Sequence, residues 1–354
     1  MKLLSVVGAR PQFVKLGPVH RAIVARGHDH TIVHTGQHYD ENMSDVFFAQ
    51  LGIPQPDVNL SVGSATHGKQ TSLMLGLLES YFETAKPDWV VVYGDTNSTL
   101  AAALAAVKMQ IRVVHLEAGL RSFNRAMPEE HNRVLTDHAS DLLLAPSSIA
   151  LAHLANEGLG ARALLVGDVM VDVCLETKAK VLKTRPTMPI DWISERHYYV
   201  ATIHRQENTD DPDQLERVIG HLESCSTPIA LLAHPRLRAK CKEFGIHLER
   251  CGIEVFEPLS YEQLVFAVLM SEGVVTDSGG LQKEAFLLGK PCVTLRKETE
   301  WVETVELGWN RLDAGLSLNL DDELRKPRRS VVNPYGAGDA SKLVVQAIEA
   351  ASCL

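Results

Sequence analysis

The chain alternates short, continuously apolar runs with longer stretches of helical character, and this pattern constrains its fold more than any other feature. Strands of a parallel sheet that are covered on both faces are continuously apolar, so such runs predict buried strands. The first half of the chain contains six of them: Leu3–Val7, Thr31–His34, Trp89–Tyr93, Val113–Leu116, Leu142–Ala145 and Leu164–Val166. The alanine-rich run Thr96–Met109 between two of these strands has high helix propensity. Alternation of this kind is typical of a parallel sheet with crossover helices.

The alternation pauses once and then resumes. The segment Thr184–Arg196 contains Pro186 and Pro189 and has no clear period, so we interpret it as a linker. Strand-like runs then return: Tyr198–Thr202, Ile229–Ala233, Glu254–Phe256, Gly273–Thr276 and Cys292–Leu295. At roughly 150 residues per domain, a chain of 354 residues is expected to form two domains. We therefore predict an α/β fold of two doubly wound domains, residues 1–183 and 184–354, facing an interdomain cleft.

Composition excludes several classes of protein. Apolar residues make up 45% of the chain and charged residues 22%, which is typical of a globular protein and not of a disordered one. Acidic residues outnumber basic ones by 44 to 35, and this balance argues against nucleic acid as a partner. The six cysteines show no C-x-x-C spacing, so we expect buried thiols in a reducing compartment.

Neither a membrane segment nor a targeting segment is expected. No run approaches the roughly 20 apolar residues that span a bilayer. The start, Met1–Val7, carries the charge of a signal peptide but is too short and continues directly into Gly8. We therefore expect a cytoplasmic protein that does not bind membranes.

Polar residues directly after the strands are the places to look for a ligand site. The first strand leads into Gly8-Ala9-Arg10-Pro11-Gln12, with Lys15 about one turn into the next helix. A helix N-terminus with Arg10 and Lys15 suits an anion, but a tight turn with two solvated cations is an equal alternative. No G-x-x-x-x-G-K-[ST] or G-x-G-x-x-G motif follows a strand, so we expect neither nucleotide-triphosphate hydrolysis nor a nicotinamide cofactor.

Three carboxylates follow strands or open a helix in the first half. Asp95 follows Trp89–Tyr93, where capping the next helix is the common role of an aspartate. Glu117 comes directly after Val113–Leu116, a position with few structural duties. Of Glu129 and Glu130, one is expected to complement the dipole of a helix opened by a proline. Gathered at the strand ends, such carboxylates would repel one another, which raises a carboxylate pKa for acid–base work.

The second half places two histidines and a glycine pair at strand ends. His204 and His234 each lie just beyond a strand, although most of the 15 histidines must have structural roles. With no H-E-x-x-H and no tight cluster of histidine and carboxylate, we expect no metal site. Ser278-Gly279-Gly280 opens a helix and offers backbone amides to a diphosphate, and Glu284 lies one turn further, where it can accept hydrogen bonds from ribose hydroxyls.

Together these motifs resemble those of a known family, the non-hydrolysing UDP-N-acetylglucosamine 2-epimerases. The match runs in order from Met1 to about Ser341. The motifs that carry it are Gly8-Ala9-Arg10-Pro11, Gly94-Asp95-Thr96, Glu117-Ala118-Gly119-Leu120-Arg121, Pro128-Glu129-Glu130, Thr202-Ile203-His204-Arg205-Gln206-Glu207-Asn208 and Asp277-Ser278-Gly279-Gly280. Three further motifs resemble a sub-branch that includes UDP-2,3-diacetamido-2,3-dideoxyglucuronate 2-epimerases. They are His34-Thr35-Gly36-Gln37-His38-Tyr39-Asp40, Arg121-Ser122-Phe123-Asn124 and Thr299-Glu300-Trp301-Val302-Glu303.

The resemblance implies two Rossmann-like domains of the glycosyltransferase-B type, with a C-terminal helix at about residues 338–354 as a candidate to pack back on the first domain. It also implies an isomerase without a cofactor, which eliminates UDP to form a 2-acetamidoglucal and then re-adds it to invert C2. The substrate would be UDP-GlcNAc, in exchange with UDP-ManNAc, or the equivalent UDP-2,3-diacetamido-2,3-dideoxyglucuronate. Family members are commonly homodimers and supply sugars for surface polysaccharides.

Roles for individual residues follow from the same resemblance. Proton transfer falls to Asp95, Glu117 and Glu129, and His204 lies by the diphosphate to protonate or stabilise it. Substrate binding falls to Arg10 and Lys15 for the diphosphate charge, Ser278, Gly279 and Gly280 for phosphate, Glu284 for ribose and His234 on the nucleotide side.

Three rival functions remain at this point. A glycosyltransferase of the same fold would have little need of three acids in the first domain. A hydrolysing epimerase, which releases free ManNAc and UDP, is a nearer rival. A UDP-sugar sensor without activity would leave Asp95, Glu117 and Glu129 without a role.

Overall fold

In the computed structural model, the chain divides into two compact units. Unit 1 comprises Met1–Val173 and Asn333–Leu354, and unit 2 comprises Cys174–Val332. The structure describes residues 1–37, 48, 53–189, 197–329 and 333–353. Part of one sub-branch motif, His38–Asp40, and the second half of the expected linker, residues 190–196, lie outside these ranges.

Unit 1 is built on a seven-stranded sheet in the order β3-β2-β1-β4-β5-β6-β7, in which all pairs are parallel. The order reverses between β1 and β4, so the sheet is doubly wound, with its topological switch point there. The strands are β1 (Lys2–Val7), β2 (Asp29–His34), β3 (Val58–Asn59), β4 (Trp89–Tyr93), β5 (Arg112–Leu116), β6 (Leu142–Ala145) and β7 (Ala163–Leu165).

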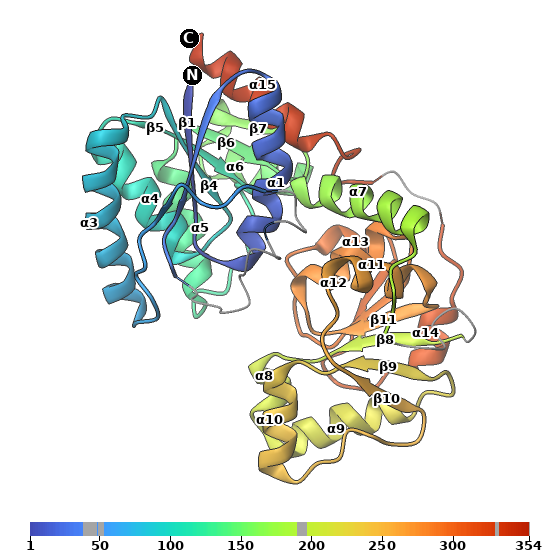
Figure 1. The fold of residues 1–354 in the computed structure, drawn as a ribbon. Coiled ribbons are helices and arrows are strands. Elements are labelled where there is room, and N and C mark those ends of the chain that lie inside the picture. The colour runs from blue at the N-terminus through green and yellow to red at the C-terminus, as the bar shows by residue number, and fades with distance from the viewer. Residues whose placement is uncertain (38–47, 49–52, 190–196, 330–332, 354) are drawn as a thin grey trace. The chain divides into compact units, whose positions relative to one another are not determined.

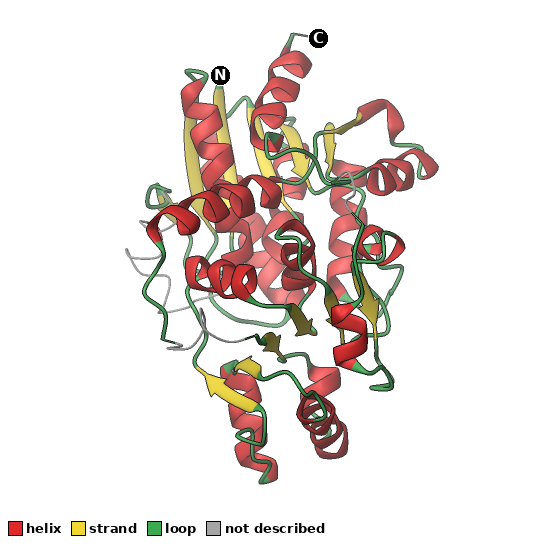
Figure 2. Ribbon diagram, turned by 90° about the vertical axis from the view of Figure 1, so that its right-hand side faces the viewer, coloured by secondary structure: helices red, strands yellow, loops and turns green. Residues whose placement is uncertain are grey.

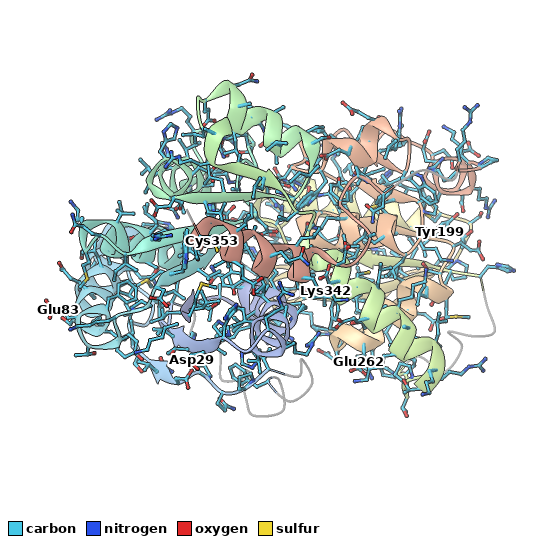
Figure 3. The ribbon with its side chains drawn as sticks, turned by 90° about the horizontal axis from the view of Figure 1, so that it is seen from above. Asp29, Glu83, Tyr199, Glu262, Lys342 and Cys353 are labelled. Atoms are coloured by element: carbon cyan, nitrogen blue, oxygen red, sulfur yellow. The ribbon has the colours of Figure 1, made fainter. Side chains whose placement is uncertain are left out.

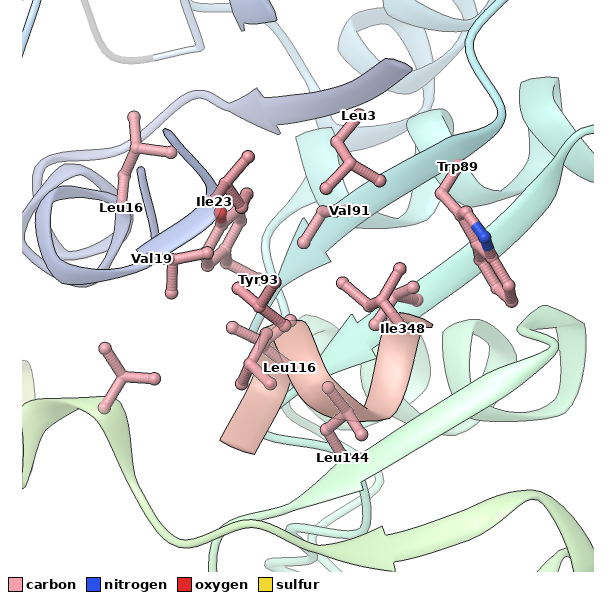
Figure 4. Packing of buried hydrophobic residues seen from close by; sticks show 14 of the residues in the cluster. Leu3, Leu16, Val19, Ile23, Trp89, Val91, Tyr93, Leu116, Leu144 and Ile348 are labelled. Atoms are coloured by element: carbon pink, nitrogen blue, oxygen red, sulfur yellow. The ribbon is translucent and has the colours of Figure 1, made fainter. Parts of the chain in front are cut away.

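Helices cover both faces of this sheet (Figures 1 and 2). The helices of unit 1 are α1 (Arg10–Ala25), α3 (His67–Ala85), α4 (Asn97–Lys108), α5 (Pro128–Ala139), α6 (Ser148–Asn156), the 3₁₀ helix η1 (Gly160–Arg162), α15 (Ala340–Ser352) and the first part of α7 (Val169–Thr184), which continues into unit 2. Alternate strand residues face opposite layers, as Leu3 and Leu4 do. Leu3 packs with residues of α1 and α15, among them Ile348 (Figure 4). Leu4 packs with residues of α3 and α4 on the other face.

Unit 2 repeats the architecture with a six-stranded parallel sheet in the order β10-β9-β8-β11-β12-β13. Its switch point lies between β8 and β11. The strands are β8 (Tyr199–Thr202), β9 (Ile229–Leu232), β10 (Ile253–Phe256), β11 (Gly273–Thr276), β12 (Cys292–Thr294) and β13 (Asn310–Leu312). The helices are α8 (Gln206–Thr209), α9 (Pro212–Glu223), α10 (Pro235–Phe244), α11 (Tyr261–Met270), α12 (Gly279–Leu287), α13 (Val302–Glu306) and α14 (Leu320–Arg325).

The division between the units falls inside α7, ahead of the boundary at 183/184 that the sequence suggested. Cys174 and Val181, from the second part of this helix, are buried in a core cluster of unit 2. The C-terminal helix α15 belongs to unit 1, where it lies beside α1 (Figure 1). Glu83, on α3, is exposed and points away from the core (Figure 3).

The α/β fold and the apolar runs that predicted strands are confirmed. The sequence pattern did not predict β3 and β13. Both are short strands at the edge of a sheet, where a strand pairs with a neighbour on one side only and need not be continuously apolar. Of the six unpaired cysteines, three are buried, but Cys251 and Cys353 are exposed, so the expectation of buried thiols was wrong for these two. Within the described ranges, no helix is long and apolar enough to cross a membrane.

Candidate active site

The three candidate carboxylates of unit 1 lie where β4 and β5 end and where α5 begins. Asp95 lies in the turn between β4 and α4, Glu117 directly follows β5, and Glu129 is in the first turn of α5. Because β4 and β5 are adjacent and parallel, their carboxyl ends meet at one edge of the sheet. The approach is close: a Cβ atom at Gly94 would stand 3.1 Å from Oε2 of Glu117.

Glu117 has a backbone conformation that side chains rarely adopt. Its φ of 65° lies in the left-handed region, which costs a residue other than glycine energy of the order of 1 kcal/mol or more. Strain of this kind persists where the surroundings enforce it, and it concentrates at functional sites. The turn therefore places the Glu117 carboxylate at the sheet edge at an energetic cost.

Lys15 of α1 forms an ion pair with Glu117. The two side chains are only 14% and 10% exposed, so water screens the pair weakly. Burial by itself would lower the pKa of Lys15, but Glu117, together with Asp168 and Asp95, raises that pKa above its ordinary value. Lys15 is thus held as a cation against Glu117.

Arg133 of α5 joins Asp95 to Glu130. Its guanidinium forms an ion pair with Asp95 and donates to Oε2 of Glu130 at 3.2 Å. The backbone of Asp95 is also anchored, because Nδ2 of Asn132 donates to its carbonyl oxygen at 2.9 Å. The Asp95 side chain is 31% exposed, so its carboxylate is fixed and still open to a ligand.

The two glutamates that open α5 differ. Glu130 is buried and accepts hydrogen bonds from the backbone amides of Ser122 and Phe123, each at 3.0 Å, so it orders the loop that follows Arg121. Glu129 is half-buried, and its carboxylate forms no ion pair with any residue that the structure describes. Both lie in the first turn, where a carboxylate complements the helix dipole.

Two expectations for unit 1 need correction. The N-cap of α4 is Thr96, whose side chain accepts from the amide of Thr99, so Asp95 does not cap the helix. The carboxylates do not stand as a repelling cluster, because Asp95 and Glu117 each pair with a cation of their own.

At the start of α1, the sequence left an anion site and a tight turn as equal alternatives. The side chain of Gln12 accepts from the amides of Gly8 and Ala9 at 2.7 and 3.0 Å, so these donors are taken. Lys15 faces Glu117, and Arg10 is exposed on the first turn of α1.

In unit 2, the buried carboxylate of Asp277 organises the turn after β8. It accepts hydrogen bonds from the backbone amides of His204 and Arg205 at 3.0 Å and from Nδ2 of Asn208 at 3.1 Å. Burial would raise the pKa of Asp277, but its contacts with the His204 ring, Arg205 and Asn208 lower it. Nδ1 of His204 lies 3.1 Å from Oδ1 of Asp277, so Nδ1 carries a proton and Nε2 points away from the carboxylate.

His234 stands next to His204, with the ring centroids 5.5 Å apart. Its Nδ1 accepts from the amide of Arg236 at 3.2 Å, which requires the hydrogen of the neutral ring to be on Nε2. Burial, together with the neighbouring His204, lowers the pKa of His234. The two rings therefore offer two Nε2 atoms at the carboxyl edge of the second sheet.

Ser278, Gly279 and Gly280 form the N-terminus of α12 as the sequence predicted. Ser278 is the N-cap and accepts from the amide of Leu281, and Gly280 is exposed. This nine-residue helix directs its first amides and its dipole to the end of β11. Glu284, one turn further on, is buried.

A second charged pair borders the glycines. Arg296 and Glu300 form a two-pronged ion pair with both distances 3.0 Å, and this pairing offsets burial and lowers the pKa of Glu300. A Cβ atom at Gly279 would lie 3.5 Å from Oε2 of Glu300 and 3.8 Å from the guanidinium of Arg205. The helix start is therefore flanked by two arginines, Arg296, which is paired with Glu300, and Arg205.

Sequence reasoning missed the roles of Arg133, Asp277 and Arg296 as partners of the candidate residues. Asp277 directly follows a strand, which is a readable signal, whereas nothing in the local sequence of Arg133 indicates its contact with Asp95, 38 positions away. No group of three or more histidine, cysteine or carboxylate residues suited to a metal occurs within the ranges that the structure describes.

The fold, with polar sets at the switch points of two doubly wound sheets, defines an α/β protein of the glycosyltransferase-B type. A family model described as "UDP-N-acetylglucosamine 2-epimerase" matches residues 21–349, and the chain belongs to this family, whose members are isomerases. The chain is 44% identical to a UDP-2,3-diacetamido-2,3-dideoxy-D-glucuronate 2-epimerase from Pseudomonas aeruginosa, with 98% of this chain and 99% of that protein covered.

Solved structures agree with this assignment. A crystal structure of UDP-GlcNAc 2-epimerase from Methanocaldococcus jannaschii, in complex with UDP-GlcNAc and UDP, matches with a TM-score of 0.87 and 39% identity over 99% of this chain and 100% of that chain. The UDP-GlcNAc 2-epimerase from Neisseria meningitidis bound to UDP-GlcNAc matches with a TM-score of 0.84 and 27% identity, over 99% of this chain and 100% of that chain.

Proposed function

We propose that this protein is a UDP-sugar 2-epimerase that interconverts UDP-GlcNAc and UDP-ManNAc, or the equivalent pair of UDP-2,3-diacetamido-2,3-dideoxyglucuronates. The observation that carries the proposal is the strained Glu117, paired with Lys15, beside an Asp95 that is paired with Arg133. A protein that only bound a UDP-sugar would have no need for carboxylates held at such cost. The relatives at 44% and 39% identity act on the two candidate sugars, so both remain substrates to be tested.

Unit 2 supplies the proposed UDP site. The amides of Gly279 and Gly280 at the start of α12, with the Ser278 side chain, are proposed to bind phosphate oxygens, because a helix N-terminus favours an anion. His204, oriented by Asp277, and His234 present Nε2 atoms that can donate to the diphosphate or protonate it as it leaves. Glu284 is proposed to accept hydrogen bonds from the ribose hydroxyls.

Unit 1 supplies the proposed acid–base groups. In the elimination, a carboxylate takes the C2 proton, the electrons of the C2–H bond form the C1=C2 bond, and UDP leaves with the electrons of the C1–O bond. In the return step, UDP adds to C1 while C2 receives a proton on its opposite face. The groups proposed for these transfers are Asp95, Glu117 and Glu129.

The cations of unit 1 have separate proposed roles. Lys15 balances the charge of Glu117 and is available to exchange a proton with it, and Arg133 fixes Asp95. Arg10, exposed on the first turn of α1, is proposed to contact the diphosphate.

We also propose the cellular setting. The enzyme would act in the cytoplasm as a homodimer, without a cofactor, and would supply activated amino sugars for surface polysaccharide synthesis. The support is the resemblance of its motifs to those of the family and the match to the family model along most of the chain.

Parallel incubation with UDP-GlcNAc and UDP-2,3-diacetamido-2,3-dideoxyglucuronate, followed by NMR of the products, tests the function and selects the sugar. The proposal predicts a mixture of two C2-epimeric UDP-sugars from one of the substrates. Asp95→Asn should still bind UDP but lose turnover, and Glu254→Gln, a change on an exposed strand position, is the matched control. Free sugar with UDP would instead indicate a hydrolysing epimerase, and no reaction of either sugar would contradict the proposal.

A further inference from the structure

A buried histidine lies behind the two strand-end turns of unit 1. His115, on β5, is fully buried, and both of its ring nitrogens have partners. Nδ1 lies 2.7 Å from Oδ1 of Asp137, on α5, and Nε2 lies 2.7 Å from the carbonyl oxygen of Gly94. A carbonyl oxygen can only accept, so Nε2 carries a hydrogen.

Asp137 has two further donors besides the His115 ring. Oδ2 of Asp137 accepts from Arg121 at 2.7 Å and from the amide of Gly119 at 3.1 Å, which favours an ionised carboxylate. Nδ1 of His115, 2.7 Å from Oδ1, completes the set of partners around this carboxylate. Arg121 continues the series with a two-pronged ion pair to Glu157 at 2.7 and 2.8 Å. The contacts therefore run without a break from His115 through Asp137 and Arg121 to Glu157.

These contacts end on the backbone of both turns that carry the acids. Nε2 of His115 holds the carbonyl of Gly94, the residue before Asp95, and Asp137 holds the amide of Gly119, two residues after Glu117. Gly94 and Gly119 have φ values of 62° and 83°, so each turn contains a left-handed residue whose position these bonds fix. No atom of the pair needs to reach a ligand to have this effect.

We propose that the hydrogen-bonded pair of His115 and Asp137 is a positioning device that holds the Asp95 turn and the Glu117 turn at the separation required for proton transfer. This inference rests on the proposed epimerase function, for which these carboxylates are the acid–base groups. Misplacing a catalytic group by a fraction of an ångström slows the chemical step without changing how the nucleotide binds. The pair should therefore affect kcat and leave the affinity for UDP unchanged.

The test combines one substitution with a matched control. Asp137→Asn keeps the shape of the side chain, but its amide group has one acceptor oxygen and cannot accept from all three donors, which are His115, Arg121 and the amide of Gly119. Asp172→Asn is the control, because Asp172 is also buried in unit 1 and accepts from two backbone amides, those of Ala340 and Ser341, at the start of α15. We expect Asp137→Asn to lower kcat by about tenfold or more with KM and the UDP dissociation constant within about twofold, while Asp172→Asn keeps kcat.

An independent measurement reports the contact with the Gly94 carbonyl. In the wild-type protein labelled with ¹⁵N-histidine, Nε2 of His115, assigned by its loss in His115→Gln, should carry a hydrogen that exchanges slowly with solvent. An Nε2 without a hydrogen would overturn the proposal, whether or not the protein is an epimerase and whether or not Asp137→Asn folds. Full kcat in Asp137→Asn would also overturn it, as would an equal loss in the control. A hydrogen on Nε2 in a wild-type protein that epimerises neither sugar would refute the proposed function instead.

Discussion

Replacement of Asp277 by asparagine should destabilise unit 2 and weaken UDP binding together. Asp277 is fully buried and accepts from two backbone amides, the Asn208 amide and the His204 ring. An asparagine keeps one acceptor oxygen but turns an NH₂ group toward donors. The loss of a hydrogen bond to a buried charge costs about 1.5–3 kcal/mol, and the donor left unsatisfied adds about 1–3 kcal/mol. We expect the free energy of unfolding to fall by about 3–5 kcal/mol.

Thermal and urea unfolding measure this loss, with Asp322→Asn, an exposed position of unit 2, as the control. At about 2–4 °C per kcal/mol, the melting temperature should fall by roughly 6 °C or more. Because the pKa of Asp277 is lowered in the folded state, its contribution is present above its unfolded pKa of about 3.9 and is lost as the pH falls through the folded value. The difference between wild type and variant should therefore shrink below about pH 4. A melting temperature within 1 °C of wild type at neutral pH would refute the reasoning.

Three further outcomes are expected. Lys15→Met should reduce kcat by about a hundredfold with little change in UDP affinity, because Lys15 pairs with Glu117. If calorimetry showed a loss of UDP affinity as large as the loss of kcat, Lys15 would be a ligand of the diphosphate instead. Glu284→Ala should weaken UDP binding by about 1–3 kcal/mol, and unchanged affinity would remove Glu284 from the site. Hydrogen bonds to Asp321 outweigh its burial and lower its pKa to about 2, so part of the stability should be lost as the pH falls from about 4 through 2. Asp321→Asn should lack this acid-dependent loss in urea titrations.

Much of the fold was predictable because buried parallel strands are apolar along their whole length. Val90–Val92 and Leu142–Ala145 are examples, and each lies within a strand. Local sequence does not fix which of two polar neighbours caps a helix, and both Asp95 and Thr96 are residue types that cap helices well. Because Asp95 forms an ion pair with Arg133, the cap of α4 is Thr96. That choice depends on a residue on another helix.

The sequence predicted where the candidate residues lie in the fold better than it predicted which side chains they contact. Ser278 and Gly279 open α12 as expected, because serine and glycine favour that position whatever the rest of the chain does. The pairing of Lys15 with Glu117 joins residues 102 positions apart, so only the folded sheet reveals it. The resemblance to the family gave Lys15 a role toward the diphosphate, and the structure places it against a carboxylate.

The central claim is that C2 is inverted by loss and return of a proton, with UDP leaving in between. The most direct measurement is turnover of the accepted UDP-sugar in heavy water, followed by ¹H NMR and mass spectrometry of both epimers. The account predicts that solvent deuterium enters at C2 of the product in each turnover, and that Asp95→Asn incorporates none. Product that keeps its original C2 hydrogen after many turnovers would contradict the elimination mechanism and the roles given to Asp95, Glu117 and Glu129.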